Sequence, residues 1–90
     1  MGYNLGRRMP TIWTEAGLDF IIYPNDHSPA HVHVVKAGDE VIINLGDARN
    51  LPYVRSIYRM RTKEIGKALG IAISKQEYFL NRWREIHGSD

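Results

Sequence analysis

The hydrophobic pattern of this chain changes period near residue 62, and this change constrains the fold more than any other feature. Before that point, apolar and polar residues alternate in short runs separated by glycine, proline and acidic residues. Alternation places neighbouring side chains on opposite faces of a strand, whereas spacings of three and four place them on one face of a helix. The second pattern is formed by Ile65, Leu69, Ala72, Ile73, Gln76, Leu80, Trp83 and His87. Strands followed by a helix predict an α+β fold.

We expect an antiparallel sheet of four to five strands, because turn residues separate the consecutive strand-like runs. These runs cover residues 11–14, 18–23, 31–36, 40–45 and 54–58. Residues 62–87 are expected to form one long helix, because the apolar stripe keeps its phase throughout, with Thr62 as N-cap and Gly88 as the stop. A break near Gly70 is the alternative, since glycine costs about 1 kcal/mol relative to alanine. The predicted core consists of Trp13, Phe20, Ile22, Val41, Ile43, Leu69, Ile73, Leu80 and Trp83.

Length and composition limit the kind of protein this can be. Ninety residues suffice for one domain, and the absence of cysteine excludes disulfides and thiolate metal ligands. No apolar run approaches the length of a membrane span, and no signal-peptide pattern opens the chain, so we expect a cytoplasmic protein. The net charge of +2 is uneven, because residues 1–48 sum to −3 and residues 49–90 to +5. The basic half could face an acidic partner.

Three of the four histidines lie within seven residues, as His27, His31 and His33. On a strand, His31 and His33 would share one face with Cα atoms about 6.5–7 Å apart. Two imidazoles at that separation can converge on one divalent metal such as zinc, with His27 from the preceding loop and Asp26 or His87 as further ligands. Four alternatives remain open. The histidines could be metal ligands, a metal-free acid–base pair, a hydrogen-bonded structural surface, or a surface that recognises a protein or nucleic acid without catalysis.

Acid–base chemistry by His27, His31 and His33 would suit RNA cleavage if a cation held the phosphate. The candidates for phosphate or nucleic-acid binding are Lys36, Arg55, Arg59 and Arg61. The three arginines would share a face with Tyr53 and Ile57 if residues 53–61 were extended throughout, and Tyr53 could then stack on a base.

Four segments carry a family resemblance. Residues 9–12 read Met-Pro-Thr-Ile, residues 23–27 Tyr-Pro-Asn-Asp-His, residues 29–34 Pro-Ala-His-Val-His-Val, and residues 83–88 Trp-Arg-Glu-Ile-His-Gly. In this order they resemble the DUF4160 family of small bacterial proteins over about residues 9–88, although Ala30 stands where the family usually has proline. The resemblance implies that residues 9–88 are a single domain. It also implies that residues 1–8 are a flexible extension or follow an upstream start codon, with Met9 as the family-like start.

The resemblance further implies association with toxin–antitoxin systems and a cognate small protein encoded nearby. We therefore expect a small cytoplasmic toxin–antitoxin type component that binds a partner protein or nucleic acid and uses the surface of His27, His31 and His33. The alternative is a histidine-dependent hydrolase, most plausibly a ribonuclease, with or without a metal.

Overall fold

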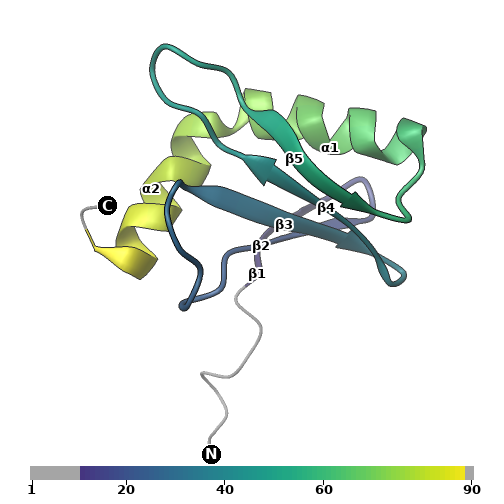
Figure 1. Cartoon of the computed structure of the whole chain (residues 1–90), viewed down its shortest axis with the longest axis horizontal. Helices are drawn as coiled ribbons and strands as arrows, with labels where there is room; N and C mark the ends of the chain where they lie inside the picture. The colour runs from purple at the N-terminus through teal and green to yellow at the C-terminus, as the bar shows by residue number, and fades with distance from the viewer. Residues whose placement is uncertain (1–10, 89–90) are drawn as a thin grey trace, which may run out of the picture.

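The computed structural model describes residues 11–88 and shows a twisted sheet with two helices against one face (Figure 1). The strands are β1 (Thr11–Glu15), β2 (Leu18–Ile21), β3 (His31–Lys36), β4 (Asp39–Asn44) and β5 (Tyr53–Tyr58). Each strand pairs antiparallel with its neighbour in the sequence, so the sheet order is β1-β2-β3-β4-β5. The predicted α+β class is confirmed. The predicted extension, residues 1–8, and the start at Met9 lie outside the described residues.

Two-residue turns fix the register of two hairpins. Ala16 and Gly17 have φ of 56° and 77°, and Ala37 and Gly38 have φ of 49° and 88°. Positive φ at both central residues is the signature of a type I′ turn, whose twist matches that of the strands it joins. The second turn pairs His33 with Ile42. The register of β3 on β4 therefore follows from a turn that the sequence marks with a glycine.

The prediction of one long helix is wrong, because the helical region is divided at Lys75. α1 spans Thr62–Ser74 and α2 spans Gln76–His87, and they run in different directions in Figure 1. Gly70 lies inside α1, so the alternative break point is wrong as well. At the break, Lys75 has φ −110° and ψ 21°. The side-chain amide of Gln76 donates to the carbonyls of Leu45, Asp47 and Asn50, which ties the start of α2 to the β4–β5 loop.

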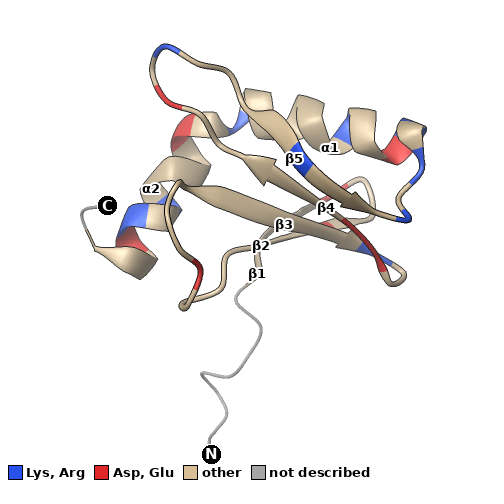
Figure 2. Ribbon diagram, viewed as in Figure 1, with Lys and Arg blue, Asp and Glu red and all other residues tan. Residues whose placement is uncertain are grey.

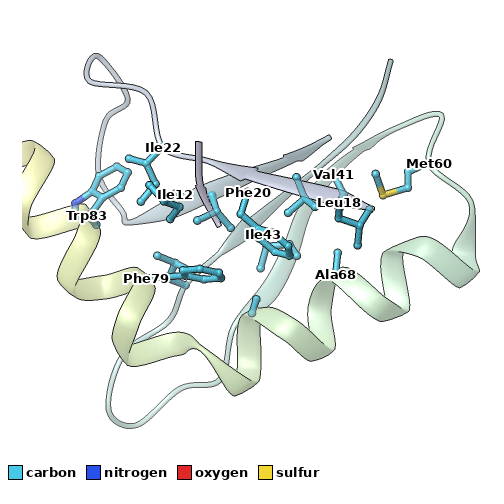
Figure 3. Packing of buried hydrophobic residues seen from close by; sticks show 14 residues of the cluster. Ile12, Leu18, Phe20, Ile22, Val41, Ile43, Met60, Ala68, Phe79 and Trp83 are labelled. Carbon is cyan, nitrogen blue, oxygen red and sulfur yellow. The ribbon is translucent and has the colours of Figure 1, made fainter. Parts of the chain in front are cut away.

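The core lies between the sheet and the helices (Figure 3). Among the predicted members, Phe20, Ile22, Val41, Ile43 and Trp83 are buried, whereas Trp13, Leu69 and Leu80 are only partly buried. Ile73 is 40% exposed, so its assignment to the core is wrong. Because the helix is divided, the residues that face the sheet differ in part from the predicted apolar stripe. The buried helix residues are Ala68, Ala72, Phe79 and Trp83.

None of the helices in residues 11–88 is long and apolar enough to cross a membrane.

Candidate functional site

Strand β3 places His31 and His33 on one face of the sheet, as the alternation predicts. Val32 and Val34 point to the other face, where they are fully buried against the helices. The two imidazole rings lie 5.1 Å apart between centroids. The valines hold the strand in the core, and this leaves the histidine pair in a fixed position next to the β2–β3 loop.

His31 is a buried histidine at the first position of β3. Its side chain is 4% exposed and lies 5.2 Å from the Trp83 ring between centroids. Nδ1 lies 2.9 Å from the Pro29 carbonyl oxygen. Because that oxygen can only accept, Nδ1 carries the proton, and in the neutral ring Nε2 is left as a lone pair. Burial lowers the pKa of His31, and the bond to Pro29 and the charge of Asp26 act against that decrease.

His33 is held between two carboxylates. Its Nδ1 lies 2.6 Å from Oε2 of Glu40, and its Nε2 lies 3.2 Å from Oδ1 of Asp26. The edge of the ring also meets Tyr23, with centroids 4.8 Å apart. These contacts fix the ring in one orientation, with Nδ1 toward β4 and Nε2 toward the loop.

Asp26 is aimed at both histidines by a tight turn. Its backbone N–H donates to the Tyr23 carbonyl at 3.0 Å, and the Tyr23 N–H donates to Oδ2 of Asp26 at 2.9 Å. The same carboxylate lies 3.6 Å from Nε2 of His31. Burial raises the pKa of Tyr23, and the charges of Glu40 and Asp26 raise it further. The loop thus places the Asp26 carboxylate close to the Nε2 atoms of both His31 and His33.

Asp26, His31 and His33 form a group whose ligand atoms all lie within 4.8 Å of one another. We call these three residues the Asp-His-His cluster. Two nitrogens and one carboxylate oxygen are ligands that zinc and related transition metals accept. Three of the four predicted metal ligands are therefore brought together.

The remaining predicted residues lie elsewhere. His27 is exposed and makes no side-chain hydrogen bond or ion pair with residues 11–88. His87 stacks on Trp83 at 3.9 Å and donates from Nδ1 to the Trp83 carbonyl, and it is not part of the cluster. Lys36 forms an ion pair with Glu64 at 3.2 Å. Neither His27 nor Lys36 therefore joins the histidine pair.

Sequence reasoning missed Glu40, although a signal for it exists. The two-residue turn after β3 pairs Val35 with Glu40 and His33 with Ile42. Residues two apart on a strand share a face, so Glu40 lies diagonal to His33, within reach of a long side chain. The glycine-containing turn and the alternation together would have placed this carboxylate beside the ring.

The prediction that Arg55, Arg59 and Arg61 share one face required an extended chain throughout residues 53–61, and only part of that segment is extended. β5 is extended, but it ends at Tyr58, and Arg59 has a φ of 66°. The pairing of β5 with β4 also shifts register between Ile42 and Ile43, which leaves Arg55 without a partner in the ladder. Alternation therefore does not extend through Arg61. All three arginines are exposed, and Arg59 lies 3.8 Å from Asp39.

β5 forms one edge of the sheet and carries large exposed side chains. Tyr53, Ile57 and Tyr58 are each more than half exposed, and Leu51 in the loop before β5 is 66% exposed. Asn44 donates to the Tyr53 hydroxyl at 2.9 Å. Beside Tyr53 lies a cavity of about 490 Å³, which the β2–β3 and β4–β5 loops also line. The same edge of the sheet carries apolar, aromatic and cationic side chains. Figure 2 shows a basic position, in blue, on β5.

The fold and the cluster define a small α+β domain with a histidine- and carboxylate-rich site at the start of a central strand. The chain belongs to the DUF4160 family, a domain of unknown function whose family model matches residues 17–84. No curated protein matches the chain, and no solved structure matches it.

Proposed function

We propose that this protein is a cytoplasmic component of toxin–antitoxin type and that it acts by binding a cognate partner protein along the edge of β5. The observation that carries the proposal is the exposed surface of Leu51, Tyr53, Ile57 and Tyr58, which we call the β5 edge. Large exposed apolar and aromatic side chains along one edge of a small domain are typical of interaction sites.

The backbone geometry favours an extended partner segment. Within the described residues, β5 pairs only with β4, so the groups on its other side are available to a further strand. Proteins commonly protect such an edge, and an unprotected one is a template for strand addition. Arg55 and Arg61 are exposed near the strand and have no ion pair with residues 11–88. Their charge favours an acidic strand as the occupant.

The test is an affinity measurement with the small protein encoded beside this one. Ile57→Lys places a charge in the β5 edge and should weaken the complex at least about tenfold, which corresponds to about 1.4 kcal/mol. Ile73→Lys is the matched control, because Ile73 is an exposed isoleucine on α1. Equal affinity of wild type and Ile57→Lys, or equal weakening by both substitutions, would contradict the proposal.

RNA is the competing occupant of the same edge, and the experiment separates the two. Charge reversal in Arg55→Glu should weaken either complex, but an RNA complex should also depend steeply on salt concentration. Binding of a short single-stranded RNA that depends on Arg55, with no binding of the neighbouring protein, would overturn the protein-partner proposal.

The second candidate function is a histidine-dependent hydrolase that cleaves RNA. The proximity of the His31 and His33 rings supports it. Burial is the main cause that lowers the pKa of His31, and the positive charge of Arg55 lowers it further. The burial of His31 makes it a poor contact for a large substrate. An RNA cleavage assay with wild type and His33→Ala tests this function, and equal cleavage by both proteins would reject it.

A further inference from the structure

We propose that the Asp-His-His cluster is a binding site for a divalent transition metal ion of the zinc class, held by Nε2 of His31, Nε2 of His33 and a carboxylate oxygen of Asp26. The site would fasten the β2–β3 loop to the sheet. The cluster residues lie on β3 and the β2–β3 loop and are not those of the β5 edge, and the proposal does not depend on what binds at that edge.

The outer contacts of both rings are those of metal ligands. A histidine that binds a metal through one ring nitrogen usually donates its other N–H to a backbone carbonyl or a carboxylate. His31 donates from Nδ1 to the Pro29 carbonyl, and His33 directs Nδ1 to Glu40 at 2.6 Å. Each ring therefore has its Nδ1 engaged on the outside and its Nε2 turned toward Asp26.

The spacing of the inner atoms suits one ion. Tetrahedral ligands at the zinc distances of 2.0–2.1 Å lie about 3.3–3.4 Å apart. Oδ1 of Asp26 lies 3.2 Å from Nε2 of His33, and Oδ2 of the same carboxylate lies 3.6 Å from Nε2 of His31. No pair of ligand atoms in the cluster exceeds 4.8 Å, so small side-chain rotations would complete the geometry.

The Asp26 carboxylate is held in position by the protein even when no metal ion is bound. Asp26 is fixed by reciprocal hydrogen bonds with the Tyr23 backbone, and its side chain is only 13% exposed. Three nearly buried ligands on a rigid strand and a tight turn lose little conformational freedom when they bind an ion. Nitrogen ligands favour zinc, cobalt, nickel and copper over magnesium and calcium.

The proposal has a definite alternative, in which His33 is a doubly protonated ring between Asp26 and Glu40. Both carboxylates lie within ion-pair distance of it. In that arrangement the network is purely structural, and removing His33 costs stability but changes no metal affinity. The two arrangements therefore differ in a measurable quantity, the affinity of the folded protein for an added ion.

The experiment uses the full chain without a histidine tag, stripped with a chelator and titrated with zinc sulfate and cobalt chloride. We expect one ion per chain by calorimetry and a tetrahedral or five-coordinate cobalt spectrum. Glu40→Gln should weaken binding about 10- to 100-fold, as removal of an outer hydrogen-bond partner usually does. Asp26→Asn and His33→Ala should each weaken it further than that.

His27→Ala is the matched control, since His27 follows Asp26 directly in the chain but lies outside the cluster. Its affinity should stay within about twofold of wild type. Absence of stoichiometric binding by wild type, unchanged affinity in Asp26→Asn, or an equal loss in His27→Ala would each overturn the proposal.

A spectroscopic measurement keeps the test independent of how well the variants fold. Nitrogen-15 resonances of wild type during zinc titration should shift at Nε2 of His31 and His33, while both Nδ1 atoms remain protonated. Shifts at His27 or His87 in their place, or none at all, would show that the ion is not held by the cluster.

Discussion

The side-chain amide of Gln76 should contribute measurably to the free energy of unfolding, because this single side chain joins α2 to the β4–β5 loop. Its Nε2 lies 2.8 Å from the Leu45 carbonyl oxygen, 3.1 Å from that of Asp47 and 2.9 Å from that of Asn50. We expect Gln76→Ala to destabilise the fold and Gln76→Glu to destabilise it more at neutral pH. The amide donates its two hydrogens to these carbonyl oxygens, whereas neither an alanine side chain nor a carboxylate can donate.

The magnitude follows from the burial of the three acceptors. The bond to Leu45 is partly buried, and its loss leaves an unsatisfied carbonyl at a cost of about 1–3 kcal/mol. The bonds to Asp47 and Asn50 are exposed, so water replaces them and they add only a few tenths each. Gln76→Ala should therefore cost about 2 kcal/mol, or about 8–16 °C in Tm for a domain of this size.

Gln76→Glu tests the donor role directly. At pH 7 the introduced carboxylate would place negative charge against three carbonyl oxygens, so the loss should exceed that of Gln76→Ala. When protonated, the carboxyl can donate one hydrogen bond, so folding should raise its pKa above the unfolded value of about 4.3. The donated bond is then fully present below that value and is lost as pH rises through the folded-state pKa.

Urea unfolding followed by tryptophan fluorescence and circular dichroism measures these free energies. Glu77→Ala is the control, because Glu77 is exposed in the same turn of α2, and it should stay within about 0.5 kcal/mol of wild type. The reasoning would be refuted if Gln76→Ala were as stable as the control, or if Gln76→Glu equalled Gln76→Ala at pH 7.

Three further predictions concern single residues, two in the β4–β5 loop and one in α1. Gly46→Ala should cost more than about 3 kcal/mol in urea unfolding, because φ is +70° and the new Cβ would overlap the Asn50 carbonyl oxygen. Gly66→Ala, with open space around a helical position, should stabilise by about 0.5–1 kcal/mol, and a loss there would contradict the argument. Hydrogen bonds from the Arg49 backbone and the Asn50 side chain lower the pKa of Asp47. The folded-state pKa is below the unfolded one, so this stabilisation is present above the ordinary carboxyl range and is lost as pH falls through the folded value. Urea midpoints measured between about pH 3 and 6 should fall less steeply in Asp47→Ala than in wild type, and parallel profiles would count against this assignment.

The elements that local sequence determines were predicted correctly. Alternation placed His31 and His33 on one face, and glycine marked the turns at Gly17 and Gly38, because strand faces and tight turns depend on neighbouring residues. The α+β class followed from the change of period alone.

The elements that depend on distant contacts were not predicted correctly. The break at Lys75 accompanies hydrogen bonds between Gln76 and a loop about thirty residues earlier, and no helical pattern contains that information. The candidate site was predicted in part for the same reason. The turn between Tyr23 and Asp26 directs the carboxylate inward and leaves His27 exposed, although the two residues are adjacent in the chain.

The order of strands in the sheet has a consequence for how the chain reaches this structure. Every strand pairs with its neighbour in the sequence, and two connections are tight turns. Contacts that are close along the chain require little loop closure before they form, and this favours faster folding than pairings between distant segments do. We expect the central hairpin of β3 and β4 to form early, since it has the longest continuous pairing. The two histidine ligands of the proposed metal site, His31 and His33, would then be in place on β3 before α2 docks.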